Sequence, residues 1–73
     1  MLIDYINAAM KTAQYKIIPD DGSFVGTIPP CQGVWSNETT LEACRNELIE
    51  VLESWLFFRI SRNLPIPTVV LAR

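Results

Sequence analysis

The chain has 73 residues, of which 49% are apolar, and its 6 cationic and 8 anionic side chains give a formal net charge of −2. This length holds one hydrophobic core, so a single domain over residues 1–73 is expected. Six cations are too few for a strong phosphate-binding patch, and we therefore expect no direct binding of nucleic acid. The absence of histidine excludes Ser-His-Asp and Cys-His catalysis and every zinc site that needs an imidazole.

The two cysteines also argue against a metal centre. Cys31 and Cys44 cannot complete a four-thiolate site within one chain, so we expect two reduced thiols, one in a loop and one on a helix, and no cofactor. No segment reaches the ~18 apolar residues of a membrane span. The first residues lack the basic start and long apolar stretch of a signal peptide. The sequence predicts a cytoplasmic protein with no membrane association.

The first half of the chain predicts a helix followed by three strands. Residues 2–13 carry apolar side chains at helical spacing and form an amphipathic helix. Residues 14–18 and 24–28 alternate in polarity on either side of a turn rich in proline, aspartate and glycine, which predicts a β-hairpin. The prolines at 29 and 30 end the second strand. Residues 33–36 form a third short strand.

The second half predicts a long helix and a last strand. Thr39 and Glu42 are spaced as a capping box, and apolar residues then recur every three or four positions through about Arg62. The apolar stripe comprises Leu41, Cys44, Leu48, Val51, Leu52, Trp55 and Phe58. Residues 68–72 form an apolar run typical of a strand covered on both faces. A long helix before this strand permits parallel pairing.

The predicted fold class is therefore α+β, with the element order α-β-β-β-α-β. Three antiparallel strands form a meander, and a fourth strand lies parallel to the first, which gives the sheet order 3-2-1-4. The long helix covers one face of this sheet. The short N-terminal helix covers part of the sheet or reaches a second subunit.

Five short motifs follow one another in the middle of the chain. They are the strand Tyr15 to Ile18, the turn Asp21-Gly22, the strand Phe24 to Pro29, the loop Pro29-Pro30-Cys31-Gln32-Gly33 and the helix start Thr40-Leu41-Glu42-Ala43. In this order and spacing, residues 15–53 resemble the HicB family of antitoxins from type II toxin–antitoxin systems. The loop departs from the family pattern, which has Pro-Gly-Cys where this chain has Cys31-Gln32-Gly33.

The resemblance implies a partial ribonuclease-H-like fold without nuclease activity. In the family, this domain neutralises HicA, a small basic mRNA-cleaving toxin, by covering its active surface. Many members also carry a carboxy-terminal DNA-binding domain, whereas this chain ends at Arg73, directly after the last predicted strand. We therefore expect a short form, for which autorepression through DNA is in doubt.

The leading functional hypothesis is a protein-binding module and not an enzyme: a HicB-like antitoxin, or an orphan relative, that binds a small basic protein. Acidic and aromatic side chains are the candidate contacts, namely Phe24, Trp35, Asn37, Glu38, Glu47 and Glu50. The alternative interpretation places the two aromatic residues in the core and the two helical glutamates on a solvated face. A metal-dependent nuclease would need clustered carboxylates, one commonly in the first strand, which here has none.

A further alternative is an oligomeric interaction module that has no toxin partner. The apolar content is high for so short a chain, and a homodimer or larger oligomer would bury the excess. The candidate interface residues come from the N-terminal helix and from the end of the long helix, and they are Leu2, Ile3, Tyr5, Leu56, Phe57 and Ile60.

Overall fold

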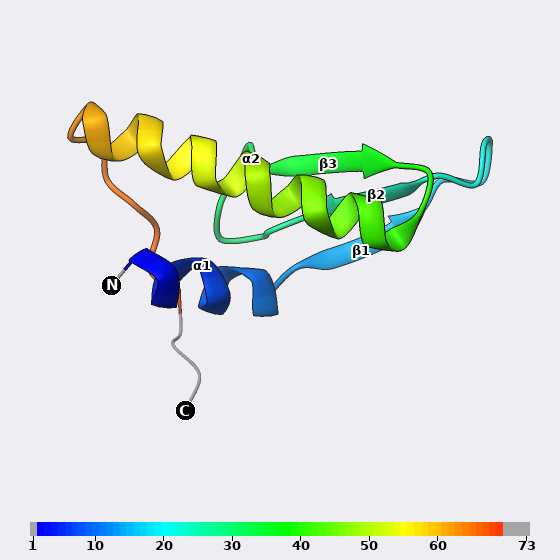
Figure 1. Ribbon diagram of the computed structural model, residues 1–73, viewed down its shortest axis with the longest axis horizontal. Coiled ribbons are helices and arrows are strands. Elements are labelled where there is room, and N and C mark those ends of the chain that lie inside the picture. Colours follow the sequence, from blue (N-terminus) through cyan, green and yellow to red (C-terminus); the bar gives the residue numbers. More distant parts are fainter. Residues whose placement is uncertain (1, 70–73) are drawn as a thin grey trace.

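The computed structural model describes residues 2–69 and contains two helices and three strands within them (Figure 1). In chain order they are α1 (Leu2–Lys11), β1 (Gln14–Ile17), β2 (Phe24–Thr27), β3 (Trp35–Glu38) and α2 (Leu41–Ser61). The predicted helix, hairpin and long helix are confirmed. The third strand begins two residues later than predicted, because a turn from Ile28 to Val34 closes first with Val34 N–H donating to Cys31 O at 3.1 Å.

The three strands form an antiparallel sheet in the order β1-β2-β3. One row across the sheet consists of Tyr15, Gly26 and Ser36, and these residues face α2. Side chains alternate along each strand, so the residues on either side of this row point to the opposite face. The hairpin turn is closed by Gly22, whose φ of 70° suits glycine and whose N–H donates to Ile18 O at 2.8 Å.

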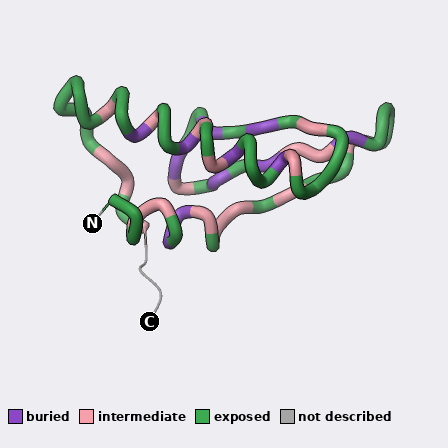
Figure 2. Tube along the Cα trace, in the orientation of Figure 1, coloured by how far each residue is buried: buried purple, intermediate pink, exposed green. Residues whose placement is uncertain are grey.

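Helix α2 packs across one face of the sheet through a single row of residues four positions apart. Cys44, Leu48, Leu52 and Leu56 are all fully buried. The three leucines cluster with Ile28, Cys31 and Val34, while Cys44 Sγ lies 3.2 Å from Ser36 Oγ. Figure 2 shows this row as buried segments along the side of α2 that faces the strands. The core therefore lies between α2, the sheet and the loop before β3. The helices of residues 2–69 include none that is long and apolar enough to cross a membrane.

The start of α2 differs from the predicted capping box by one residue. The N-cap is Thr40 and not Thr39: its backbone is extended, and its Oγ1 accepts a hydrogen bond from Ala43 N–H at 3.1 Å. Thr40 has no glutamate three residues later, so the reciprocal half of a capping box is missing. The long helix accordingly begins at Leu41, which is exposed and lies outside the core.

The predicted fourth strand is absent from the residues that the structure describes. Residues 64–69 follow α2 without regular structure, and the chain passes beside α1 (Figure 1). Tyr5 Oη donates to Pro67 O at 2.6 Å, and Arg59 Nε donates to Pro65 O at 2.7 Å. These contacts, and two prolines that lack an N–H, direct the segment to the helices instead of the edge of β1. Residues 70–72 of the predicted strand lie outside the described part.

Candidate functional site

A groove runs along the side of α2 that borders the loop before β3. Its volume is about 440 Å³, and it is lined by Glu47, Glu50, Val51, Ser54, Trp55 and Phe58. These positions recur at three- and four-residue spacing, so they form one continuous side of the helix. The carboxylates lie toward the start of the helix and the aromatic rings toward its end. The groove therefore combines an acidic end with an apolar end, and we call it the α2 groove.

Trp55 lies between Gly33 and Arg59 at the apolar end, and it packs against the core. Its Nε1 lies 4.0 Å from the position that a Cβ would occupy at Gly33, whose φ of 95° only glycine adopts readily. On the other side, the guanidinium of Arg59 lies 5.0 Å from the Trp55 ring centroid. Arg62 stacks in the same way on Phe58, at 4.9 Å. Each of the two aromatic rings therefore makes a cation–π contact with an arginine of the same helix.

The carboxylates of the α2 groove are available for a partner. Glu47 and Glu50 are exposed, and neither forms an ion pair with another residue of the 2–69 range. The arginines at the end of the helix are engaged over Trp55 and Phe58. A cationic side chain of a partner can therefore pair with the two glutamates while an apolar one packs against the rings.

The structure separates the six predicted partner contacts into three places. Only Glu47 and Glu50 lie together in the α2 groove. Because Ser36 faces α2, its neighbours Trp35 and Asn37 point to the uncovered face of the sheet. Trp35 is 59% exposed, so the alternative interpretation that placed it in the core is wrong.

The other predicted contacts have structural roles or lie apart from the groove. Asn37 Nδ2 donates to Phe24 O at 2.8 Å and to Ser23 Oγ at 2.9 Å, which ties β3 to β2. Phe24 and Glu38 are paired across the strands at the far end of the sheet, and both are half-buried. These side chains support the sheet.

Sequence reasoning missed the apolar half of the groove. Val51, Trp55 and Phe58 belong to the predicted apolar stripe. The structure packs Val51 and Trp55 against the core but leaves both half-buried, and it leaves Phe58 exposed beside them in the groove. The signal was present in the spacing, since positions 47, 51, 54 and 58 lie on one side of a helix. It was hidden because almost every residue at the end of α2 is apolar.

The six predicted oligomer-interface residues also differ in how far they are exposed. Leu56 is 0% exposed, so its assignment to a surface interface is wrong: it continues the buried row of Cys44, Leu48 and Leu52. Tyr5 is half-buried, with its Oη 3.7 Å from Cys31 Sγ and bonded to Pro67. The remaining four residues are exposed, and they are Leu2, Ile3, Phe57 and Ile60.

The cysteines are unpaired and buried, in agreement with the expected reduced thiols. Burial raises the pKa of the Cys31 thiol above its usual range. The pKa of Tyr5 is raised strongly, mainly by burial and to a smaller extent by its hydrogen bond to Cys31. In the turn, the Ser23 N–H donates to Asp21 Oδ1 at 2.9 Å and lowers the pKa of that carboxyl. Within residues 2–69, no cluster of three or more His, Cys, Asp or Glu side chains is placed to hold a metal ion.

Comparison with known proteins places the fold and the family. The crystal structure of TTHA0281 from Thermus thermophilus is similar to this chain, with a TM-score of 0.86 and 35% sequence identity over 93% of this chain and 84% of that one. A search of curated proteins gives no significant match. The family model described as UPF0150-like matches residues 4–67, which include both helices' packing residues, the sheet and the α2 groove. The chain therefore belongs to the UPF0150-like family.

Proposed function

We propose that this chain is a cytoplasmic protein-binding module that acts as a HicB-like antitoxin and has no catalytic activity of its own. Its partner in this proposal is a small basic protein of the HicA type, which cleaves mRNA. The motifs in residues 15–53 that resemble the HicB family support the proposal, and they fall within the part of the chain matched by the UPF0150-like model.

The α2 groove is the observation that carries the proposal. Stable recognition of a protein uses an aromatic or aliphatic anchor in a desolvated centre and charged groups at the rim. Trp55 and Phe58 supply the anchor surface, and Glu47 and Glu50 supply the rim. Complementary charge also speeds the encounter with a basic partner.

The chemistry of RNA cleavage explains how such a contact neutralises a toxin. A protein that cleaves mRNA must hold phosphate groups with lysines or arginines. Pairing of these cations with Glu47 and Glu50 competes directly with the RNA backbone. The antitoxin then needs only to cover the cationic surface of the toxin.

Co-expression with a small basic protein of the HicA type tests the proposal. We expect that protein to arrest growth alone, and this chain to restore growth and co-purify with it. The double variant Glu47→Gln/Glu50→Gln removes the two groove charges and is expected to weaken binding at least tenfold. The matched control is Asp20→Asn/Glu42→Gln, which removes two exposed carboxylates outside the groove and should bind as the wild type does.

Three results would contradict the proposal. They are the absence of growth arrest, the absence of binding, and equal weakening by the groove variant and the control. A chain that self-associates but binds no basic protein would favour the alternative function of an oligomeric interaction module.

A further inference from the structure

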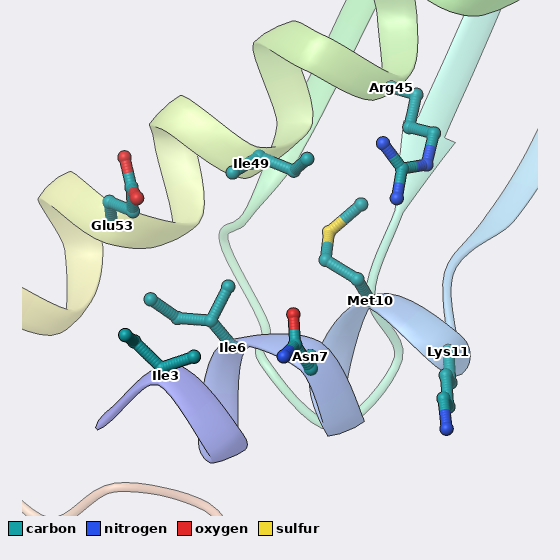
Figure 3. Close-up of a pocket in the computed structure, with 8 residues that line it drawn as sticks. All are labelled: Ile3, Ile6, Asn7, Met10, Lys11, Arg45, Ile49 and Glu53. Atoms are coloured by element: carbon teal, nitrogen blue, oxygen red, sulfur yellow. The ribbon is translucent and has the colours of Figure 1, made fainter. Parts of the chain in front are cut away.

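A hollow on the uncovered face of the sheet differs in charge from the hollows beside α2. The α2 groove is acidic, and the hollow between α1 and α2 carries charges of both signs, with Arg45 at one end and Glu53 at the other (Figure 3). The hollow on the sheet has a volume of about 380 Å³, and none of its lining residues is charged. They are Val25 and Thr27 of β2, residues 28, 29 and 31–34 of the loop, and Trp35 of β3. We call it the Trp35 hollow.

The Trp35 hollow combines an apolar floor with an exposed aromatic wall. Ile28, Cys31 and Val34 are buried and form the floor, whereas Trp35 is 59% exposed. The indole ring offers a flat apolar surface and one N–H donor. Tryptophan is also among the side chains that contribute most to binding at protein interfaces. These properties make the hollow a candidate docking site.

A single cation lies at the rim of the Trp35 hollow. Lys16 of β1 is the directly opposite neighbour of Val25 in the sheet, so both side chains point to the uncovered face about 5 Å apart. Among the strand residues on this face, Lys16 is the only charged one. It is exposed and forms no ion pair within residues 2–69. The hollow is therefore complementary to an apolar group that is accompanied by a carboxylate.

The backbone around the Trp35 hollow has little to offer a ligand. Val25 and Thr27 belong to the central strand, which is paired on both sides. The N–H groups of Cys31 and Val34 are bonded within the loop. A peptide in the hollow cannot join the sheet as a further strand, so its own backbone must stay in water. The polyproline II helix meets this requirement, because it has no internal hydrogen bonds and a fully solvated backbone.

We infer that the Trp35 hollow binds a proline-rich segment of a protein partner in the polyproline II conformation, with an acidic residue that pairs with Lys16. Proline-rich segments dock in grooves lined by aromatic side chains. The Trp35 indole N–H and the exposed side chains of Thr27 and Gln32 can donate hydrogen bonds to the carbonyl groups of the segment. The site is independent of the proposed function, because the α2 groove lies on the other side of the sheet.

The sheet geometry sets the position of the acidic residue. Lys16 and Trp35 are separated by two strand spacings across the sheet and by two residues along the strands, which are about 10 Å and about 7 Å. The resulting separation is about 12 Å. A polyproline II helix rises about 3.1 Å per residue. The acidic residue is therefore expected about four positions from the proline that contacts Trp35.

An NMR titration with a synthetic peptide tests the inference. The probe consists of eight prolines with one glutamate at each end, so either chain direction can place a carboxylate near Lys16. We expect the indole N–H signal of Trp35 to shift in a saturable way, with a dissociation constant below about 1 mM, while the Trp55 signal stays in place. A peptide with serines in place of the prolines should not bind. A peptide with lysines in place of the glutamates should bind more weakly.

Variants of the protein assign the contacts, with binding measured by the fluorescence anisotropy of the labelled probe. Trp35→Ala should weaken binding about tenfold or more. Lys16→Gln should weaken it by about two- to fivefold, as an exposed ion pair does. The matched controls are Phe57→Ala and Lys11→Gln, which remove an exposed ring and an exposed lysine elsewhere and should bind as the wild type does. Circular dichroism checks that each variant is folded.

Several results would overturn the inference. They are an unchanged Trp35 signal, equal binding of the serine peptide, tighter binding of the lysine peptide, and a folded Trp35→Ala variant that binds as well as the wild type. A Trp35 signal that moves with protein concentration alone would also overturn it, and would assign this face to a second copy of the chain.

Discussion

Gly26 of β2 lies directly beneath Cys44 of α2, and Gly26→Ala tests this packing. A Cβ at this position would lie 3.1 Å from Tyr15 Cε1, 3.2 Å from Cys44 Sγ and 3.2 Å from Ser36 Oγ. The last two atoms have little freedom, because Cys44 is fully buried and Ser36 Oγ donates to Cys44 O at 2.8 Å. The added methyl group must therefore displace α2 or the strands by a few tenths of an ångström.

The expected destabilisation follows from two opposing effects. Overpacking of a core site costs about 1–3 kcal/mol. Replacement of glycine by alanine reduces the entropy of the unfolded chain and returns about 0.4–1 kcal/mol. The net loss is about 1–2 kcal/mol, out of a total stability of about 4–11 kcal/mol for a domain of this size. The corresponding fall in Tm is roughly 4–15 °C.

Urea unfolding followed by circular dichroism measures the effect, and a double-mutant cycle assigns its cause. Cys44→Ala removes the Sγ atom, so Gly26→Ala should cost less in that background, with a coupling of about 0.5–1 kcal/mol. Gly22→Ala is the control: a Cβ there meets nothing within 4 Å, and its cost arises from the positive φ. That cost should add to the effect of Cys44→Ala. A Gly26→Ala protein as stable as the wild type would refute the reasoning.

Three other predictions concern the helix cap, the alkaline limit and nucleic acid. Thr40→Ala should lower the free energy of unfolding by about 1 kcal/mol, and Thr39→Ala should change it by less than about 0.5 kcal/mol, because only Thr40 caps α2. Equal effects in urea titrations would contradict this. Folding raises the pKa values of Cys31 and Tyr5, so at alkaline pH the unfolded chain releases these protons before the folded protein does. The free energy of unfolding should therefore keep its full value below about pH 9 and fall at higher pH. In the variant Tyr5→Phe/Cys31→Ala, the free energy of unfolding should fall less steeply with pH above this value. The same slope as in the wild type would contradict this assignment. In mobility-shift assays near physiological salt, the protein should bind neither DNA nor RNA at micromolar concentration, and a clear shift would show that the charge argument fails.

The sequence predicted the elements of this fold better than their ends. Amphipathic spacing, a turn rich in proline, aspartate and glycine, and a long apolar stripe are local signals, and they identified both helices and the hairpin. The choice between Thr39 and Thr40 as the cap depends on where the chain leaves β3. Two adjacent threonines carry no information about that point.

The apolar end of α2 shows why candidate surfaces were harder to predict. Trp55, Leu56, Phe57, Phe58 and Ile60 leave little contrast between the sides of the helix. The buried row runs in steps of four from Cys44 to Leu56, and this direction is set by the crossing of α2 over the sheet. Periodicity alone therefore placed Leu56 on the surface and Phe58 in the core, while the structure does the reverse.

The predicted fourth strand is not shown by its described residues, 68 and 69, for a related reason. An apolar run predicts burial, but it does not specify which surface will bury it. Directly before this run, Pro67 accepts a hydrogen bond from Tyr5, which is 62 residues away in the sequence. A contact over that separation has no local signature.

The two tryptophans offer the most direct test of the proposed binding surface. Trp55 lies in the α2 groove, and Trp35 lies on the opposite, uncovered face of the sheet. Each gives one indole N–H signal in a ¹⁵N-correlated NMR spectrum, and titration with a small basic protein of the HicA type reports on both surfaces at once. Binding through the groove predicts that the Trp55 indole signal shifts or broadens while the Trp35 signal stays in place. A shift of Trp35 with Trp55 unchanged would contradict the account and assign recognition to the sheet.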